Sequence, residues 1–141
     1  MRPTESASRG KKGKRPWRIG VRDPRGGARD LFARVDVSGA SLSTSADNES
    51  FFFVDGARYH HILDPRTGWP SKGVRSVTVV HEDGTLADAL STAVMVLGRE
   101  RGMEVARQLG AELLLVDAEG QVAFTPGLAP RLELLAEPRR D

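Results

Sequence analysis

Two stretches of the chain combine residue types that can bind a ligand or accept a proton. In the first, residues 59–70 (YHHILDPRTGWP), a histidine, a carboxylate, a guanidinium and a hydroxyl follow the end of a predicted strand. Side chains alternate along a strand, so His61 lies on the opposite face from His60. An Asp-Pro pair at Asp64 then ends the strand, and Gly68 supplies a position for positive φ. A strand that aims such groups into a loop is a common way to build a site, although the same pattern also fits an ordinary turn after a half-buried histidine.

The second stretch, residues 87–93 (ADALSTA), has helical character. Asp88 and Thr92 are four residues apart, which places them on one helix face. A carboxylate and a hydroxyl at that spacing can both reach one Mg²⁺ ion, which prefers oxygen ligands. Two structural alternatives stay open. Thr85 and Asp88 fit a capping box, and the Thr92 hydroxyl can bond back to a carbonyl one turn earlier.

Together these stretches resemble the C-terminal part of the FAD:protein FMN transferases, the ApbE-type flavin transferases. The family usually has Gly at the position of Ala46. Its domain is considerably longer, and its N-terminal half supplies part of the FAD pocket, a Gly- and Lys-containing flavin motif and a further metal ligand. That half has no counterpart here. The motifs that carry the resemblance are residues 17–21 (WRIGV), 23–24 (DP), 44–47 (TSAD), 61–68 (HILDPRTG), 87–92 (ADALST) and 97–98 (LG).

The resemblance implies an enzyme that transfers FMN from FAD to a Ser or Thr hydroxyl of an acceptor protein, with Mg²⁺ as cofactor and release of AMP. Arg66 is expected to meet either a phosphate or a neighbouring acid. The implied roles are catalysis by His61 and Asp88, metal binding by Asp88 and Thr92, and binding of FAD by Ser45, His61, Ile62, Asp64 and Thr67.

Two other interpretations of the chain compete with the transferase. One is a truncated, non-catalytic flavin- or metal-binding module that needs the missing N-terminal half, and the other is a non-functional fragment of a longer gene product. An incomplete cofactor cleft would leave apolar surface exposed, so we expect a dimer or a partner that supplies the missing half.

Composition excludes several classes of protein. The 141 residues contain no cysteine, which removes disulfides, thiolate metal sites, a catalytic thiol and a lipid-anchoring cysteine. No apolar run approaches the roughly 20 residues of a membrane helix, and the first 15 residues lack the apolar core of a signal peptide, so we expect a cytoplasmic protein. Six of the 21 basic and one of the 19 acidic residues lie within residues 1–15. The other 15 basic and 18 acidic residues make the body mildly acidic, which argues against nucleic-acid binding.

The pattern of elements predicts an α+β fold in which a helix pair packs on one face of a mostly antiparallel sheet. The expected helices cover residues 86–97 and 99–109, and residues 38–45 lead into a hydroxyl-rich loop. We expect residues 1–15 to be a disordered basic tail, residues 16–128 to form the transferase-like domain portion and residues 129–141 to be a C-terminal tail.

Overall fold

The computed structural model describes residues 4–8 and 15–141. It confirms the predicted α+β class, with antiparallel sheets and two helices. The elements are β1 (Thr4–Ser8), β2 (Trp17–Arg22), β3 (Leu31–Val37), β4 (Ala40–Ala46), β5 (Phe51–Val54), β6 (Ala57–His60), β7 (Val74–His81), α1 (Gly84–Leu97), α2 (Arg99–Gln108), β8 (Glu112–Asp117), β9 (Val122–Phe124), the 3₁₀ helix η1 (Pro126–Arg131) and β10 (Leu132–Leu134).

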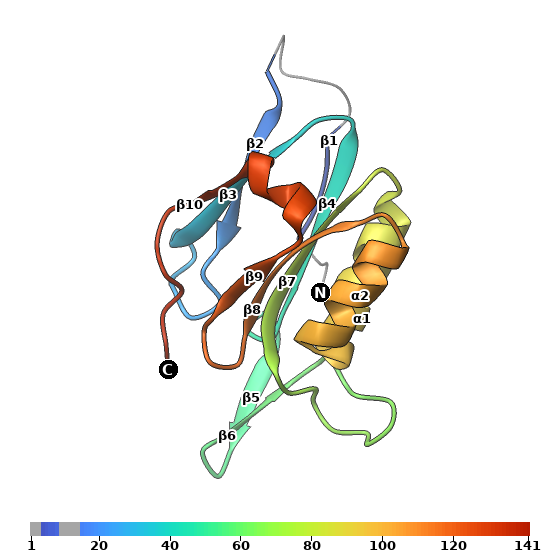
Figure 1. The fold of residues 1–141 in the computed structure, drawn as a ribbon. Coiled ribbons are helices and arrows are strands. Elements are labelled where there is room, and N and C mark those ends of the chain that lie inside the picture. The colour runs from blue at the N-terminus through green and yellow to red at the C-terminus, as the bar shows by residue number, and fades with distance from the viewer. Residues whose placement is uncertain (1–3, 9–14) are drawn as a thin grey trace.

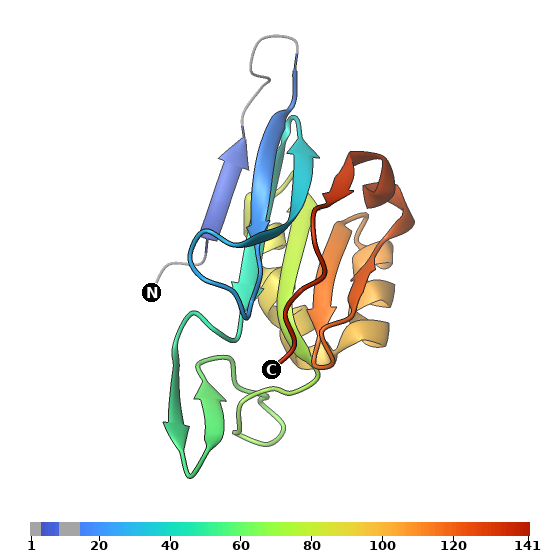
Figure 2. The ribbon, with the colours of Figure 1, turned by 90° about the vertical axis from the view of Figure 1, so that its left-hand side faces the viewer.

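Three layers build the body of the protein. The central layer is a five-stranded antiparallel sheet in the order β1-β4-β7-β8-β9. Helices α1 and α2 cover one face of this sheet, and a smaller sheet in the order β10-β3-β2 covers the other (Figures 1 and 2). Strand β7 is covered on both faces, and all of its residues except the last are buried. Its run of β-branched residues therefore reflects burial on both sides.

Alternation along the strands divides the core between the two faces. Leu113 and Leu115 of β8 pack with α1 residues such as Leu90, whereas Leu114 of β8 packs with Phe32 of β3. Because side chains alternate between the two faces of a strand, successive residues of β8 enter different parts of the core. At the α1–α2 contact, Gly102 permits close approach, because a Cβ there would lie 2.4 Å from Cγ1 of Val94.

The hairpin of β5 and β6 forms a separate two-stranded sheet that projects from one end of the body (Figures 1 and 2). Its turn uses Asp55 and Gly56 with φ of 49° and 76°, as the Asp-Gly pair predicts. Large apolar side chains are exposed on it, and Phe52 and Phe53 show 62% and 60% of their surface. Trp69, in the loop that follows the hairpin, is 61% exposed. The hairpin therefore presents aromatic surface that the rest of the described chain does not cover.

Three expectations about irregular segments need correction. Residues 38–45 are not a loop after Gly39, because β4 runs from Ala40 to Ala46 as an inner strand of the large sheet. The C-terminal residues are not a tail, since β10 pairs with β3 and Arg139 donates its backbone N–H to Asp23 Oδ2. Within residues 1–15, Thr4–Ser8 form β1, which pairs with β4. The rest of the expected basic tail, apart from Arg15, lies outside the described residues.

The pairing of β1 gives a testable consequence for stability. Successive residues of a strand point their N–H groups in alternate directions, so the double variant Glu5→Pro/Ser6→Pro removes one donor to β4 whichever residue makes the bond. We expect the free energy of unfolding to fall by about 1 kcal/mol. Denaturant unfolding measures this loss, with Glu5→Ala/Ser6→Ala as the control. Equal stability of the two double variants would show that β1 contributes nothing to folding.

Candidate active site

Hydroxyl and carboxylate groups meet where α1 crosses β4. The Ser43 Oγ donates to Asp88 Oδ1 at 3.3 Å, and the Ser45 Oγ lies 2.8 Å from Ser91 Oγ and 3.1 Å from Thr92 Oγ1. Ser43 and Ser45 share one strand face, and Asp88 and Thr92 share one helix face. We call these five residues the β4–α1 cluster. The cluster joins two motifs that lie more than 40 residues apart in the sequence.

The N-cap of α1 excludes the capping box as the role of Asp88. The helix begins at Gly84, and the side chain of Asp83 accepts from the N–H groups of Thr85 and Leu86 at 2.9 and 3.2 Å. Asp83 is therefore the N-cap, and Asp88 lies beyond the first turn, where it has no capping role. The contact that the structure gives for the Thr92 hydroxyl is with Ser45 Oγ, and the hydroxyl that bonds back to a carbonyl is that of Ser91, on Asp88 O at 2.8 Å.

The burial of the cluster leaves one side open. Ser43, Ser45 and Ser91 are buried, Asp88 is half-buried and Thr92 is exposed. Asp88 is the only carboxylate of the cluster, and the described residues contain no group of three or more His, Asp or Glu that could hold a metal. One carboxylate with neutral oxygens suits Mg²⁺, which usually keeps several waters and takes further oxygens from substrate phosphates. The donor set is therefore compatible with a metal shared with a substrate.

The two histidines of the first motif have different environments. His60 is buried, its Nδ1 accepts the Ile62 N–H at 3.3 Å, and its Nε2 lies 2.8 Å from Ser71 O. This pattern assigns the proton to Nε2, so His60 is a neutral histidine with both ring nitrogens engaged. His61 is exposed, and its backbone N–H donates to Ser50 O at 3.2 Å, while the described residues show no hydrogen bond to its ring. His61 is therefore the histidine whose ring can meet a ligand.

The loop after His61 is held by its own side chains. Asp64 accepts from the Arg66 N–H and Nε at 2.9 and 3.0 Å and from Arg66 NH2 at 2.7 Å. The side-chain bonds from Arg66, followed by its backbone bond, hold the pKa of Asp64 below its usual value. The exposed Thr67 accepts the Trp69 N–H at 3.2 Å. Of the two partners expected for Arg66, the structure shows the neighbouring acid.

Ile62 connects the loop to the cluster through the core. Its side chain is 5% exposed and packs in the same apolar cluster as Ala87 and Leu90 of α1. Its backbone is also engaged, since its N–H meets His60 and its carbonyl accepts the Ser71 N–H at 2.9 Å. In the part of the chain that the structure describes, no hydrogen bond joins the loop to the β4–α1 cluster. The predicted residues thus form two groups on a common core.

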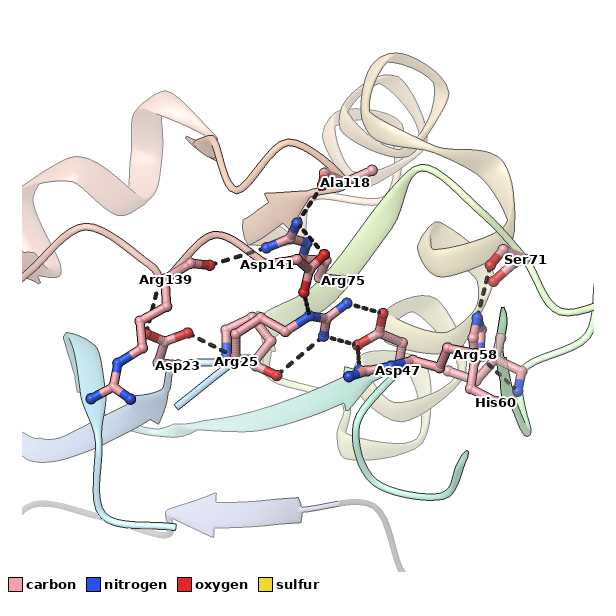
Figure 3. Close-up of polar contacts among 12 residues, drawn as sticks. Asp23, Arg25, Asp47, Arg58, His60, Ser71, Arg75, Ala118, Arg139 and Asp141 are labelled. Atoms are coloured by element: carbon pink, nitrogen blue, oxygen red, sulfur yellow. Dashed lines mark hydrogen bonds and ion pairs between the residues drawn. The ribbon is translucent and has the colours of Figure 1, made fainter. Parts of the chain in front are cut away.

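Sequence reasoning missed an ion pair that fixes the end of β4. Arg25 donates to both carboxylate oxygens of Asp47 at 2.7 and 2.9 Å, and Arg25 NH1 also donates to Pro24 O (Figure 3). The hydrogen bond to Asp47 is the main cause that raises the pKa of Arg25. Arg25 follows the quoted DP motif and Asp47 ends the TSAD motif, but 22 positions separate them, and nothing in a single sequence indicates that they pair. The pair holds the chain immediately after Ser45.

Comparisons with known proteins point to one family. The sequence profile of the ApbE family matches residues 4–115. An FAD:protein FMN transferase of Rhodobacter capsulatus is 40% identical over 126 residues, and one of Treponema pallidum is 39% identical over 121. They cover 88% and 84% of this chain, respectively. The crystal structure of the ApbE protein of Thermotoga maritima superposes on 93% of this chain with a TM-score of 0.79 and 42% identity.

The matched region is only part of each of these relatives. It spans 24% of the Rhodobacter protein, 33% of the Treponema protein and 41% of the Thermotoga chain. The resemblance read from the motifs is nevertheless confirmed along most of the chain, by sequence and by fold. The chain belongs to the ApbE family.

Proposed function

We propose that this chain carries the Mg²⁺-binding and acceptor-side part of an FAD:protein FMN transferase. The observation that carries the proposal is the β4–α1 cluster, in which Asp88 and Thr92 lie beside Ser43 and Ser45. Because Asp83 caps the helix, Asp88 is not needed as a capping residue. The relatives that match this chain are named FAD:protein FMN transferase, which supplies the reaction class.

Each predicted residue has a role in one step of the reaction. A Ser or Thr hydroxyl of the acceptor attacks the FMN phosphorus of FAD, the bond to the AMP oxygen breaks, and AMP leaves. Asp88 and Thr92 would hold Mg²⁺, which neutralises charge on the phosphates. The exposed ring of His61 takes the proton from the attacking hydroxyl, a role that an accessible imidazole nitrogen can fill. Such a reaction depends mostly on positioning and charge stabilisation.

Binding of FAD is assigned to residues around these groups. Ser45 is buried beside Thr92, and its hydroxyl can reach a ligand at the open side of the cluster. The Asp64–Thr67 loop, stiffened by Arg66, forms the wall next to His61. Ile62 supports that wall from the core, because its side chain and its backbone are already engaged. Its role is therefore to hold His61 in place.

The same chain also suits a second function, that of a flavin- or metal-binding module without turnover. The observation that favours it is coverage, since the chain spans a quarter to a third of the first two relatives. The exposed aromatic residues Phe52, Phe53 and Trp69 lie within nine positions of His61 and offer a surface for a further part of the transferase or for a second copy. A partner that covers them would complete the cleft.

Two helix variants separate metal binding from helix capping. Asp88→Asn should weaken Mg²⁺ binding by at least about tenfold, or 1.4 kcal/mol, with little change in stability. Asp83→Ala is the matched control, and it should cost about 1 kcal/mol of stability through loss of the cap while Mg²⁺ binding stays intact. Calorimetric titration with Mg²⁺ and thermal unfolding measure the two effects. A loss of stability in Asp88→Asn with unchanged Mg²⁺ binding would contradict the metal assignment.

A labelling assay tests the transferase itself. The chain, FAD, Mg²⁺ and a Ser/Thr acceptor protein are mixed, and covalent flavin on the acceptor is read as fluorescence in a denaturing gel. We expect little labelling by the chain alone and more when the N-terminal part of a relative is added in trans, because the chain spans only a quarter to a third of the first two relatives. The Asp88→Asn chain is the negative control. Labelling at about 1 s⁻¹ by the chain alone would disprove the need for a second part.

A further inference from the structure

A cavity whose charged lining residues are mostly cations lies outside the β4–α1 cluster, where the β5–β6 hairpin meets the start of β7. Its volume is about 570 Å³. The charged residues that line it are Arg25, Arg58, Lys72, Arg75, Asp47 and Asp141. Four cations thus face two carboxylates. None of these residues belongs to the site proposed for flavin transfer.

Arg75 is directed into this cavity by an irregularity of β7. The pairing of β7 with β8 shifts register between Val74 and Ser76, which is typical of a β-bulge. The side chain of Arg75 is 6% exposed, and its guanidinium donates to Ala118 O at 2.6 Å and to Arg139 O at 3.0 Å (Figure 3). These bonds fix the guanidinium in position but leave its charge to be balanced by another group.

The two carboxylates of the cavity differ in how firmly they are held. Asp47 is 11% exposed and is paired with Arg25 by two hydrogen bonds. Asp141 is 65% exposed, yet its oxygens contact Arg25 Nε at 2.6 Å and Arg75 NH2 at 2.9 Å (Figure 3). Asp141 is the only carboxylate that the structure places on Arg75 in the described residues. An exposed side chain that neutralises a buried guanidinium is readily exchanged for another anion.

The remaining charges favour an anion with two negative charges. With Asp141 removed, the four cations of the cavity face Asp47 alone. The NH1 group of Arg58 is buried and has no hydrogen-bond partner among the described residues, and its ion contact with Asp47 is 3.7 Å long. A phosphate dianion offers more charge and more acceptor oxygens than a carboxylate does. The volume also exceeds what a carboxylate needs and lies in the range of small-molecule sites.

We propose that Arg25 and Arg75 form a binding site for a phosphate group, and that the Asp141 carboxylate occupies this site in the absence of ligand. The phosphate comes from inorganic phosphate or from a small phosphomonoester, whose organic part fills the cavity toward Phe53. Ligand and Asp141 compete for the same two guanidinium groups. The proposal is independent of flavin transfer, because it uses neither Asp88 nor His61.

The test compares phosphate binding in the full chain and in Asp141→Asn, at constant ionic strength so that screening is equal. A tethered competitor acts at an effective concentration of about millimolar, so its removal should tighten the dissociation constant for orthophosphate by about tenfold. Titration calorimetry measures the constant. Glu133→Gln is the matched control, since it removes an exposed carboxylate that pairs with Arg34 instead. It should bind phosphate like the unchanged chain.

A second variant tests the role of Arg75, and a second ligand tests the source of the phosphate. Asp141→Asn/Arg75→Gln removes both charges of the pair, and it should lose the gain in affinity while circular dichroism shows a folded chain. Ribose 5-phosphate identifies the source of the phosphate, because tighter binding than orthophosphate indicates a phosphomonoester and equal binding indicates inorganic phosphate. Equal dissociation constants for the unchanged chain and Asp141→Asn would overturn the proposal, as would full binding by the double variant.

Discussion

The packing of α1 across β4 and β7 is the interaction on which the rest of the structure depends. One face of the helix buries Leu90, Val94 and Met95 against the large sheet. The same packing places Asp88 and Thr92 over the serine hydroxyls of β4. Because the apolar contact and the polar contact belong to one helix, the core cannot form without bringing the cluster together. The candidate site is thus rigid for the reason that the core is dense.

A second set of contacts fixes the end of β4 and the start of β7. The Arg25–Asp47 pair follows β4, and the bulge at Arg75 lies at the start of β7, so buried charges lie at both of these strand ends. Buried ion pairs contribute little net stability, but breaking one leaves an uncompensated charge. The C-terminal residues, which cross from β3 to this region, supply the carbonyl of Arg139 and the carboxylate of Asp141. They are structural parts of the domain.

The candidate site is divided in a way that matches the partial coverage of the relatives. The β4–α1 cluster and the His61 loop are each held by their own hydrogen bonds. Among the described residues, the core residue Ile62 connects them. A ligand that reaches both groups would need a further wall, and the family members that match this chain are three to four times as long as the matched region. The exposed aromatic hairpin beside His61 is the surface where such a wall would find apolar contacts.

The sequence by itself determined what depends on neighbours along the chain. Hydrophobic periodicity predicted α1 and α2 to within a few residues, and the Asp-Gly pair predicted the turn of the β5–β6 hairpin. The spacing of Asp88 and Thr92 placed them on one helix face. Only the tertiary structure decided that β4 is an inner strand, that β1 pairs with β4 and that β10 pairs with β3. Those outcomes depend on contacts between distant segments, such as Ser43 with Asp88 and Arg75 with Asp141, for which a single sequence holds no local signal.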